Sequence, residues 1–380
     1  MRPSKKPARR HRLPAIALAA LAAVVAGVAV IESGGDTPSS GEPALAPSSS
    51  PASDLPLGQA VGQLLVMAFD GPTAPDYLRR RLRDGAGAGV ILFGGNVSDA
   101  TQLRRLTATI QRAARGGALI ATDQEGGEIR NVPFAGPVAA QSAQRSPGAA
   151  RAAAAEAARG LRRMGLNVNL APVADVDPPT GAGVLAGRIY PGPPDAVAEL
   201  TAASLRAHDR AGVAATVKHF PGLGRASVNT DDGSATIDAS RAEIDAADLE
   251  PYRAAVAAGA PLVMAGHALY PAFDRDRIAS QSRALLTDLL RDRLGFRGVT
   301  ITDSIEAQAV LDRSDVATAA VRSIVAGADV VLMTGSGSWN LVYPRLLRAA
   351  RRSPAFRARV RESAERVLAL KRRLGLRTEP

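Results

Sequence analysis

The sequence predicts a single (β/α)8 barrel, in which eight parallel strands alternate with helices, over residues 57–376. Eight short β-prone runs are spaced along this region, and stretches rich in Ala, Arg and Leu with helical period separate them. Parallel strands need such crossovers because a tight turn cannot join them. A doubly wound open sheet is the alternative. Such a sheet usually has a glycine-rich phosphate loop after its first strand, and the residues from Phe69 to Pro72 do not form one.

The expected strands follow from the β-branched and apolar runs. They are Leu64–Phe69, Gly89–Phe93, Ala118–Thr122, Asn167–Ala171, Val213–Val217, Leu262–Ala265, Val299–Thr302 and Asp329–Met333. The expected helices are Thr101–Ala114, Ala149–Met164, Asp195–Ala211, Arg241–Ala258, Arg283–Leu294, Asp315–Ala326 and Leu341–Arg352. A last helix, Pro354–Leu374, is expected to pack on the barrel through Phe356, Val360, Val367 and Leu370, with its arginines in water.

The first 56 residues are not expected to belong to the barrel. Residues 1–12 are basic, and residues 15–31 form an uncharged apolar segment of 17 residues, which is typical of an export signal or of a membrane anchor. No cysteine follows, so processing as a lipoprotein is excluded. Residues 32–56 are rich in Ser, Pro and Gly and predict a flexible linker. We therefore expect an exported protein, either secreted or anchored on the outer face of the cytoplasmic membrane.

Composition excludes several classes of function. The chain has no cysteine, which excludes disulfides, thiolate metal sites and cysteine nucleophiles. Its formal net charge of +11 owes six charges to the first 12 residues. Aromatic residues make up only 3% of the chain, so stacking platforms for single-stranded nucleic acid are not expected. We expect no nucleic-acid partner.

Polar and ionisable residues follow the expected strands. They are Asp70, Gly94 to Asn96, Asp123 to Glu125, Asp175, Lys218 and His219, Gly266 and His267, Asp303 and Ser304, and Thr334 and Gly335. The carboxyl ends of barrel strands meet on one rim, where active sites of this fold lie. His208 is not expected there because it falls on a helical face. The pattern predicts a site rich in carboxylates with cationic and neutral donors beside them.

Such a site suits glycoside hydrolysis, which needs one group to protonate the leaving oxygen and a carboxylate to attack the sugar or activate water. Metal-assisted chemistry is less favoured, because His219 and His267 lie on different strands and no His-x-x-x-His pair is present. We therefore expect neither a metal nor a cofactor. A serine hydrolase would need a G-x-S-x-G elbow, and the sequence has none.

The chain resembles glycoside hydrolase family 3, in its single-barrel β-N-acetylglucosaminidase branch. The matching segments include D-Q-E-G-G-E-I-R (123–130), G-R-I-Y (187–190), K-H-F-P-G-L-G (218–224), M-A-G-H-A-L-Y-P (264–271) and G-V-T-I-T-D-S (298–304). The resemblance implies a carbohydrate substrate, a β-linked amino sugar of cell-wall type. It also implies that Asp303 is the nucleophile, that Asp123, Arg188, Lys218 and His219 bind the sugar, and that His267, at a family position near the site, binds it as well.

One loop departs from the family pattern. In this branch, the loop after K-H-F-P-G-H-G ends in D-S-H, whose histidine is the acid/base and whose aspartate orients it. Here the triplet is Asn229-Thr230-Asp231, and Leu223 replaces the second histidine of the opening motif. Asp231 is then the candidate general acid, with Asp232 or Glu125 as alternatives. A glycan-binding protein with weakened catalysis, or a β-glucosidase, is the alternative function.

Two further expectations concern the Lys218 segment. Truncating Lys218 or His219 should weaken sugar binding but barely change the melting temperature, because strand-end groups at the surface pack little. Gly222 and Gly224 are expected to act as hinges that let the loop close and bring Asp231 to the substrate.

Overall fold

The computed structural model describes residues 51–178 and 183–378. The predicted export segment, 1–31, and residues 32–50 of the predicted linker lie outside the described residues. The structure differs from the linker prediction at its end, where Pro51–Asp54 forms the short helix α1. The backbone N–H of Ala52 donates to Glu365, and Arg361 donates to the carbonyls of Ala52 and Leu55, so the C-terminal helix holds this segment in place.

Eight parallel strands close into a barrel. They are β1 (Leu65–Met67), β2 (Gly89–Ile91), β3 (Leu119–Thr122), β6 (Val168–Asn169), β7 (Ala214–Phe220), β8 (Leu262–Ala265), β11 (Val299–Ser304) and β12 (Val330–Met333). Their order around the barrel is β1-β12-β11-β8-β7-β6-β3-β2. Leu65 of β1 pairs with Val331, and Val66 pairs with Gly89, so β1 joins the last strand to the second. The predicted single (β/α)8 barrel is confirmed, and the open sheet is excluded.

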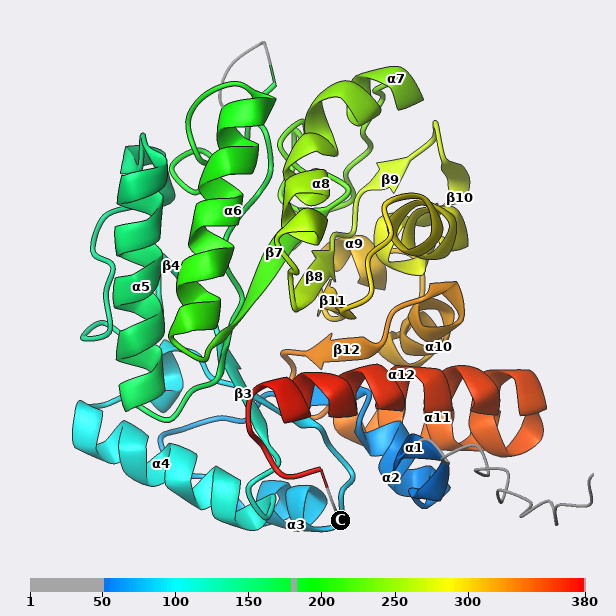
Figure 1. Cartoon of the computed structure of the whole chain (residues 1–380). Helices are drawn as coiled ribbons and strands as arrows, with labels where there is room; N and C mark the ends of the chain where they lie inside the picture. The colour runs from blue at the N-terminus through cyan, green and yellow to red at the C-terminus, as the bar shows by residue number, and fades with distance from the viewer. Residues whose placement is uncertain (1–50, 179–182, 379–380) are drawn as a thin grey trace, which may run out of the picture. The chain divides into compact units, whose positions relative to one another are not determined.

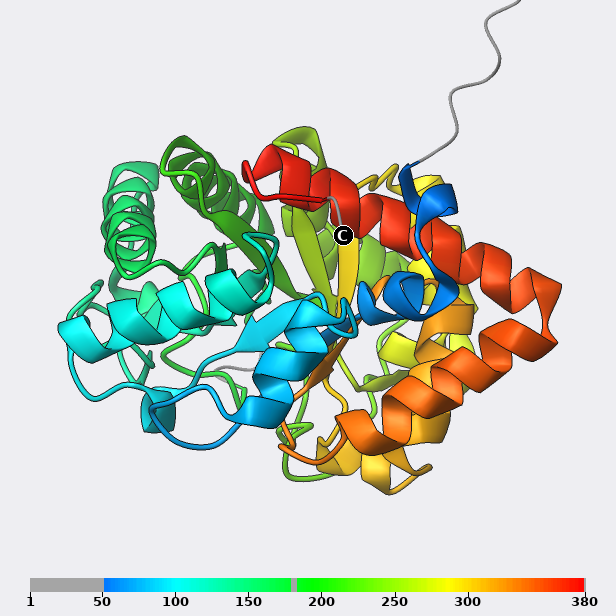
Figure 2. The same ribbon diagram turned by 90° about the horizontal axis from the view of Figure 1, so that it is seen from below.

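Helices surround the strands on all sides (Figure 1), and Figure 2 shows the same arrangement from below. They are α2 (Leu57–Gly62), α3 (Asp76–Arg83), α4 (Ala100–Ala113), α5 (Pro147–Arg163), α6 (Pro194–Arg210), α7 (Arg241–Glu243), α8 (Glu250–Ala257), η5 (Ala284–Arg293), α9 (Gln308–Leu311), α10 (Val316–Ala326), α11 (Trp339–Arg352) and α12 (Pro354–Arg373). Side chains cap several N-termini, as Asp99 does for α4 and Ser146 for α5. None of the helices in the described ranges is long and apolar enough to cross a membrane.

The secondary structure differs from the prediction in several places. The helix expected over 241–258 is divided into α7, a π-helical turn (η3, Ile244–Asp248) and α8, where Pro251 has no N–H for a continuous helix. Helix α3 was not predicted, because only Leu78 and Leu82 of its eight residues are buried. Two hairpins, β4 (Gln124–Gly126) with β5 (Ile129–Arg130) and β9 (Leu269–Tyr270) with β10 (Asp274–Ile278), lie in loops expected to have no strands.

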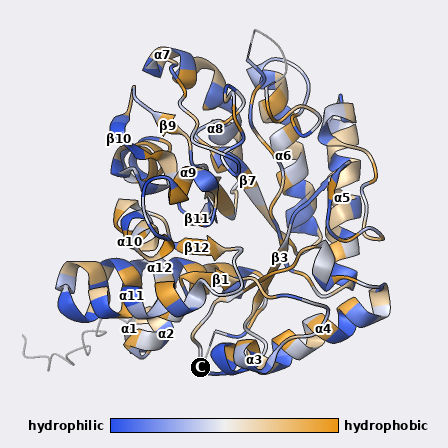
Figure 3. Cartoon of the chain, turned by 180° about the vertical axis from the view of Figure 1, so that it is seen from behind, coloured by the Kyte–Doolittle hydropathy of each residue, from blue (hydrophilic) through white to orange (hydrophobic). Residues whose placement is uncertain are grey.

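Alternate residues of the strands fill the barrel interior, among them Val66, Ile91, Met264 and Leu332. Figure 3 shows β1 and β12 as hydrophobic, whereas α11 and α12 carry hydrophilic residues outward. Val367 and Leu370 of α12 belong to the same buried cluster, so α12 closes the end of the barrel where the strands begin. The predicted contacts of α12 are confirmed, because Phe356, Val360, Val367 and Leu370 are all buried.

The prediction that the arginines of α12 stay in water is wrong for Arg359 and Arg366. Both donate to Oδ1 of Asp329, at 2.8 and 3.1 Å, and Arg291 of η5 pairs with the other oxygen. Burial alone would raise the pKa of the fully buried Asp329, but Arg291, Arg359 and Arg366 together lower it. This ionic cluster ties β12 to α12 at the end of the barrel opposite the carboxyl ends of the strands.

Candidate active site

A cavity of about 370 Å³ opens at the carboxyl ends of the strands. Its polar lining residues include Asp123, Glu125, Glu128, Arg130, Asn131, Arg188, Lys218, His219, Asn229, Asp231, Asp303, Ser304 and Thr334. Of the seven residues that the sequence singled out, six line this cavity, and His267 does not. The structure thus brings together groups from β4, β5, β7 and β11 and from the loops that follow β3, β6 and β7.

Lys218 lies at the centre of a network of buried charges. Its Nζ is 2.6 Å from Oδ1 of Asp123 and 2.7 Å from Oε1 of Glu125. Arg188 donates two hydrogen bonds of 2.9 Å to Glu125, from Nε to Oε2 and from Nη2 to Oε1. Burial would raise the pKa of Glu125, but Lys218 and Arg188 outweigh it and lower that pKa to about 2. Glu125 therefore stays ionised, and sequence reasoning missed its role in orienting the two cations.

The surface position expected for Lys218 and His219 is wrong. Only 2% of Lys218 and 4% of His219 are exposed. Asp123 and Glu125 lie against the ammonium of Lys218, and Asp175 lies against the ring of His219. Removing the Lys218 ammonium would leave Asp123 and Glu125 facing each other without their shared cation, which destabilises a fold. Truncating Lys218 is therefore expected to lower the melting temperature as well as weaken sugar binding.

His219 is held by Asp175, a fully buried carboxylate that follows β6. Its Nδ1 lies 2.7 Å from Oδ2 of Asp175, and the backbone N–H groups of His219 and Leu223 donate to the same carboxylate at 3.2 and 2.6 Å. The contact with Asp175 fixes the orientation of the ring. The other ring nitrogen, Nε2, then lies 3.8 Å from Oδ2 of Asp303. The sequence placed Asp175 on the rim but gave it no role in orienting His219.

Asp303 is the last residue but one of β11, and only one of its two carboxylate oxygens accepts a hydrogen bond from the backbone. The backbone N–H of Ser304 donates to Oδ1 at 2.8 Å, while Oδ2 faces His219 and the cavity. Burial opposes ionisation, but the charges of His219, His267 and Lys218 outweigh it and hold the pKa of Asp303 below its usual range. Asp303 is therefore an ionised carboxylate at the cavity surface, as a nucleophile must be.

His267, which the sequence places among the sugar-binding residues, does not line the cavity. Its ring is 1% exposed and lies within hydrogen-bond distance of protein groups at both nitrogens, with Nδ1 2.8 Å from Oγ of Ser280 and Nε2 2.8 Å from the carbonyl of Ser304. Through the contact with Ser304, His267 supports the end of β11, where Asp303 lies. His208 is buried on α6, as its helical position predicts, and its Nε2 lies 3.0 Å from Nδ2 of Asn169.

Asp231 reaches the cavity from the loop after β7. The carbonyls of Thr230 and Asp231 each accept at 3.1 Å from backbone N–H groups at the start of α9, those of Ala309 and Gln308. Partial desolvation at the cavity mouth, and then the charge of Asp303, raise the pKa of Asp231. The side chain remains open to solvent, so the shift is moderated by water.

Arg130 is a site residue that sequence reasoning did not single out. It ends β5 and lines the cavity, and its buried Nη1 has no hydrogen-bond partner within the described residues. A buried donor without a partner is costly unless a ligand satisfies it. The sequence did contain a signal for Arg130, because it lies in the same segment, D-Q-E-G-G-E-I-R, as Asp123 and Glu125.

Comparisons with known proteins agree with this geometry. Residues 57–370 match the glycosyl hydrolase family 3 N-terminal domain. An uncharacterized secreted glycosyl hydrolase of Arthroderma benhamiae is 34% identical over 349 residues, which cover 87% of this chain and 98% of that protein. The solved β-N-acetylhexosaminidase of Beutenbergia cavernae is 33% identical with a TM-score of 0.76, over 84% of this chain and 99% of its own.

A second solved structure, a family 3 β-N-acetylglucosaminidase from a Paenibacillus species, is 33% identical with a TM-score of 0.80. The match covers 84% of this chain and 63% of that protein, so the chain spans less than two thirds of that longer enzyme. The residues that match the family model, 57–370, include the barrel strands and the residues that line the cavity described above. The chain therefore belongs to glycosyl hydrolase family 3.

Proposed function

We propose that the cavity hydrolyses terminal β-linked N-acetylglucosamine from cell-wall-type glycans by a retaining, two-step mechanism. The chain is a glycoside hydrolase of the β-N-acetylhexosaminidase type, the class named for its solved relatives. One observation supports the mechanism most: Asp303 and Asp231 line one cavity, and their pKa values shift in opposite directions, down for Asp303 and up for Asp231. A nucleophile must be ionised and a general acid protonated, so the two environments suit the two roles.

In the first step, Oδ2 of Asp303 attacks the anomeric carbon, and the bond from that carbon to the leaving oxygen breaks. The proton of Asp231 passes to the leaving oxygen, so the alcohol departs neutral and Asp231 becomes a carboxylate. The product is a glycosyl ester of Asp303. The bond that Ser304 donates to Oδ1 keeps the free oxygen directed at the cavity.

In the second step, water attacks the anomeric carbon and the ester bond to Asp303 breaks. Asp231, now ionised, accepts the proton of that water, which restores both carboxyl groups to their starting states. The sugar leaves with the configuration it had at the start, because two inversions cancel. His219, held by Asp175, places its Nε2 beside the Asp303 oxygen that carries and then loses the sugar.

The remaining charged groups of the cavity would hold the sugar. Asp123 offers a carboxylate, and Lys218, Arg188 and His219 offer donors, all from the network described above. The unpaired Nη1 of Arg130 adds a further donor for a hydroxyl or amide oxygen of the substrate. Buried donors satisfied only by the ligand give a site strong discrimination against sugars that lack the matching group.

Neither alternative acid is as well suited as Asp231. Glu125 has its pKa lowered to about 2 and is gripped by Lys218 and Arg188, so it carries no proton to donate. Asp232 is exposed and is not among the residues that line the cavity. Asp231 lines the cavity and its pKa is raised, which supports it as the donor in place of the family's histidine.

Export of the chain is also part of the proposal. The apolar segment 15–31 supports it, as does the similarity to a secreted glycosyl hydrolase of Arthroderma benhamiae. Cell fractionation of the tagged full-length chain separates a cleaved signal from a retained anchor. Recovery in the cytosol would contradict export.

The test of the acid is Asp231→Ala assayed on aryl N-acetyl-β-glucosaminides. A substrate with a poor leaving group should lose at least a hundredfold in kcat/KM, since general acid catalysis contributes about 10²–10⁴-fold. A substrate with a good leaving group should lose far less, because its departure needs little protonation. Azide should speed the slowed second step by attacking the glycosyl ester without a base. Asp232→Ala is the matched control and should behave as the parent.

Other outcomes point to the other functions. Equal losses on both substrates, with no response to azide, would assign the proton to another group. Faster turnover of an aryl β-glucoside than of the N-acetyl-β-glucosaminide would favour a β-glucosidase. Binding of N-acetylglucosamine by the parent without turnover of any substrate would identify a glycan-binding protein.

A further inference from the structure

A second polar cavity, of about 80 Å³, lies at the end of the barrel opposite the candidate active site. Among its lining residues, Gln63, Gly87 and Gly117 come just before β1, β2 and β3, and Leu368 and Lys371 belong to α12. A single water needs roughly 10–15 Å³ of such space, so the cavity has room for a group several times larger than one water. The proposed hydrolysis makes no use of this end of the barrel.

The lining of this cavity is cationic. Arg83, Arg115, Lys371 and Arg377 line it, and none of its lining residues is Asp or Glu. Arg83 ends α3, Arg115 follows α4, and Arg377 follows α12, so three separate segments each contribute an arginine to the lining. Within the described part of the chain, none of these three side chains pairs with a carboxylate. Such like charges repel one another unless an anion lies between them.

Lys371 lines the cavity and is almost fully buried. It is 4% exposed, and its Nζ donates to Oε1 of Gln63 at 2.7 Å, its single hydrogen bond within the described residues. An ammonium group has three donors, so this contact leaves two of them for a ligand. Burial lowers the pKa of Lys371 to about 7, with no carboxylate near enough to oppose it. The charged groups that face it across the cavity, from α3, from the loop after α4 and from the C-terminal segment, are the three arginines.

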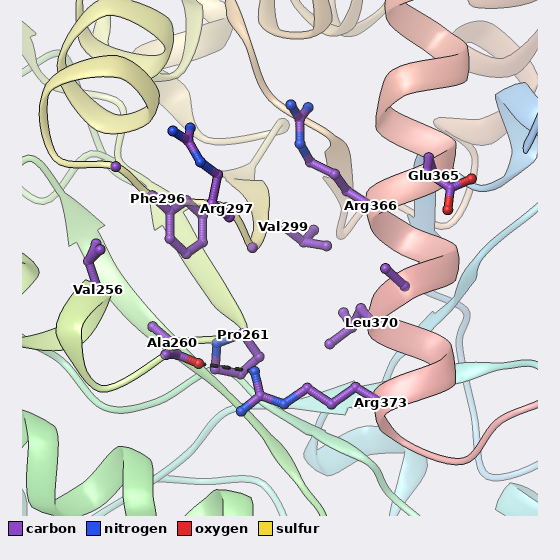
Figure 4. A pocket seen from close by; sticks show the side chains of 14 residues that line it. Val256, Ala260, Pro261, Phe296, Arg297, Val299, Glu365, Arg366, Leu370 and Arg373 are labelled. Atoms are coloured by element: carbon purple, nitrogen blue, oxygen red, sulfur yellow. Dashed lines mark hydrogen bonds between the residues drawn. The ribbon is translucent and has the colours of Figure 1, made fainter. Parts of the chain in front are cut away.

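A larger neighbouring cavity, of about 430 Å³, provides a contrast. Figure 4 shows Arg366 and Arg373 of α12 beside it, across from Phe296 and Val299. Two of its three arginines are already paired with carboxylates, Arg366 with Asp329 and Glu362, and Arg373 with Asp209. The third, Arg297, donates to the backbone carbonyl of Arg291. The cavity at Lys371 is different because its cations lack carboxylate partners.

We propose that the cavity at Lys371 binds a small multivalent oxyanion of the phosphate type. Its oxygens would accept from the two free donors of Lys371 and from the guanidinium groups of Arg83, Arg115 and Arg377, whose paired N–H groups match oxyanion geometry. The exposed rim also admits a phosphoryl group that is part of a larger molecule. Charge-assisted bonds to the buried ammonium of Lys371 are stronger than those at the surface, which favours a specific site over general screening.

The test uses the purified full-length protein and three probes, namely sulfate, inorganic phosphate and glycerol phosphate. Calorimetry measures each affinity against chloride at constant ionic strength. Lys371→Met keeps the length of the buried stem, and Arg83→Ala with Arg377→Ala removes exposed charges that no core packing depends on. Each should weaken sulfate binding at least tenfold. Arg348→Ala with Arg357→Ala, which removes two exposed arginines away from the cavity, is the matched control and should change the affinity less than twofold.

The pH dependence adds a second signature. Binding needs the charged ammonium, so sulfate affinity in the parent should fall as pH rises through about 7, and proton uptake should accompany binding above that pH. Sulfate itself does not titrate in this range, which assigns the change to the protein. Lys371→Met should abolish this dependence. If that variant fails to fold, the sulfate affinity of the double variant, Arg83→Ala with Arg377→Ala, still tests the proposal.

Two outcomes would support the site, and they differ in the origin of the oxyanion that it binds. Similar affinities for phosphate and glycerol phosphate would indicate recognition of a phosphoryl group on a larger molecule, and binding of the inorganic ions alone would indicate a free anion. Equal losses of affinity in the exposed double variant and its control would show general charge screening and overturn the proposal. No measurable binding of any probe by the parent would overturn it as well.

Discussion

Asp303 and Asp231 show how single side chains acquire opposite tasks from their surroundings. Asp303 lies beside His219, His267 and Lys218, whose charges outweigh its burial and lower its pKa. Burial, and then the negative charge of Asp303, disfavour the ionised form of Asp231, so the pKa of Asp231 rises. Each group thereby supports the other, because the ionised nucleophile keeps the acid protonated.

This arrangement predicts an acidic pH optimum. Activity needs Asp303 ionised and Asp231 protonated, so kcat/KM should fall as pH drops through the low pKa of Asp303 and as pH rises through the raised pKa of Asp231. A histidine acid would place the alkaline limb near neutrality, whereas a carboxyl group places it lower. The measurement is kcat/KM against pH for a substrate with a poor leaving group. The residual activity of Asp231→Asn should lack the alkaline limb, and an unchanged limb in that variant would refute the assignment.

At the scale of elements, the loop after β7 is held in place rather than hinged at its glycines. A Cβ on Gly224 would lie 2.0 Å from the carbonyl oxygen of Val176, and one on Gly222 would lie 2.7 Å from Cβ of Asp248. These glycines therefore permit close packing, and the hinge role expected from the sequence is not supported. The loop is instead docked on α9 through the carbonyls of Thr230 and Asp231 and through Ser234, whose Oγ donates to Asp312 at 2.9 Å.

Loosening that contact should reduce proton donation by Asp231. In Asp312→Ala, kcat for a substrate with a poor leaving group should fall about fivefold, since one net hydrogen bond is worth about 1 kcal/mol. A substrate with a good leaving group should be turned over nearly as fast as by the parent. Asp238→Ala, another exposed carboxyl beyond the loop, is the control. Equal effects of both variants on both substrates would show that the contact with α9 does not position Asp231.

In the whole molecule, the two ends of the barrel differ in what they do. The carboxyl ends of the strands carry the carboxylates and cations of the cavity, while the other end is closed by α12 and by the cluster around Asp329. Asp329 has no exposed surface, and removing it leaves Arg291, Arg359 and Arg366 without their common partner. A buried ion pair that loses one member costs a protein about 3–5 kcal/mol.

Asp329→Ala should therefore lower the free energy of unfolding by about 3–5 kcal/mol. Urea denaturation measures this change, with Asp292→Ala as an exposed control expected to have little effect. The folded fraction of Asp329→Ala should keep the parent's KM, because the cluster is at the far end of the barrel. A stability equal to that of the parent would mean that the three arginines are adequately solvated without Asp329.

The barrel was predictable from the sequence because each strand and each crossover helix is a local pattern. The rim residues were predictable for a related reason, since the carboxyl ends of the strands must converge. Asp123 directly follows β3, and Lys218 and Asp303 are among the last residues of β7 and β11. The ionic cluster was not predictable, because Asp329 meets arginines 30, 37 and 38 residues away in the chain. The roles of Glu125 and Asp175 depend on similar long-range pairing, 63 residues to Arg188 and 44 residues to His219.

The most direct test of the central claim is to trap the glycosyl ester on Asp303. A fluorinated N-acetylglucosamine analogue with a good leaving group should react once with the parent protein and turn over slowly. Mass spectrometry of the digested protein should then place the label on the peptide containing Asp303, and Asp303→Ala should take up no label while keeping its fold. A label on Asp175, Asp231 or Asp232, or labelling of Asp303→Ala, would contradict the assignment of Asp303 as the nucleophile.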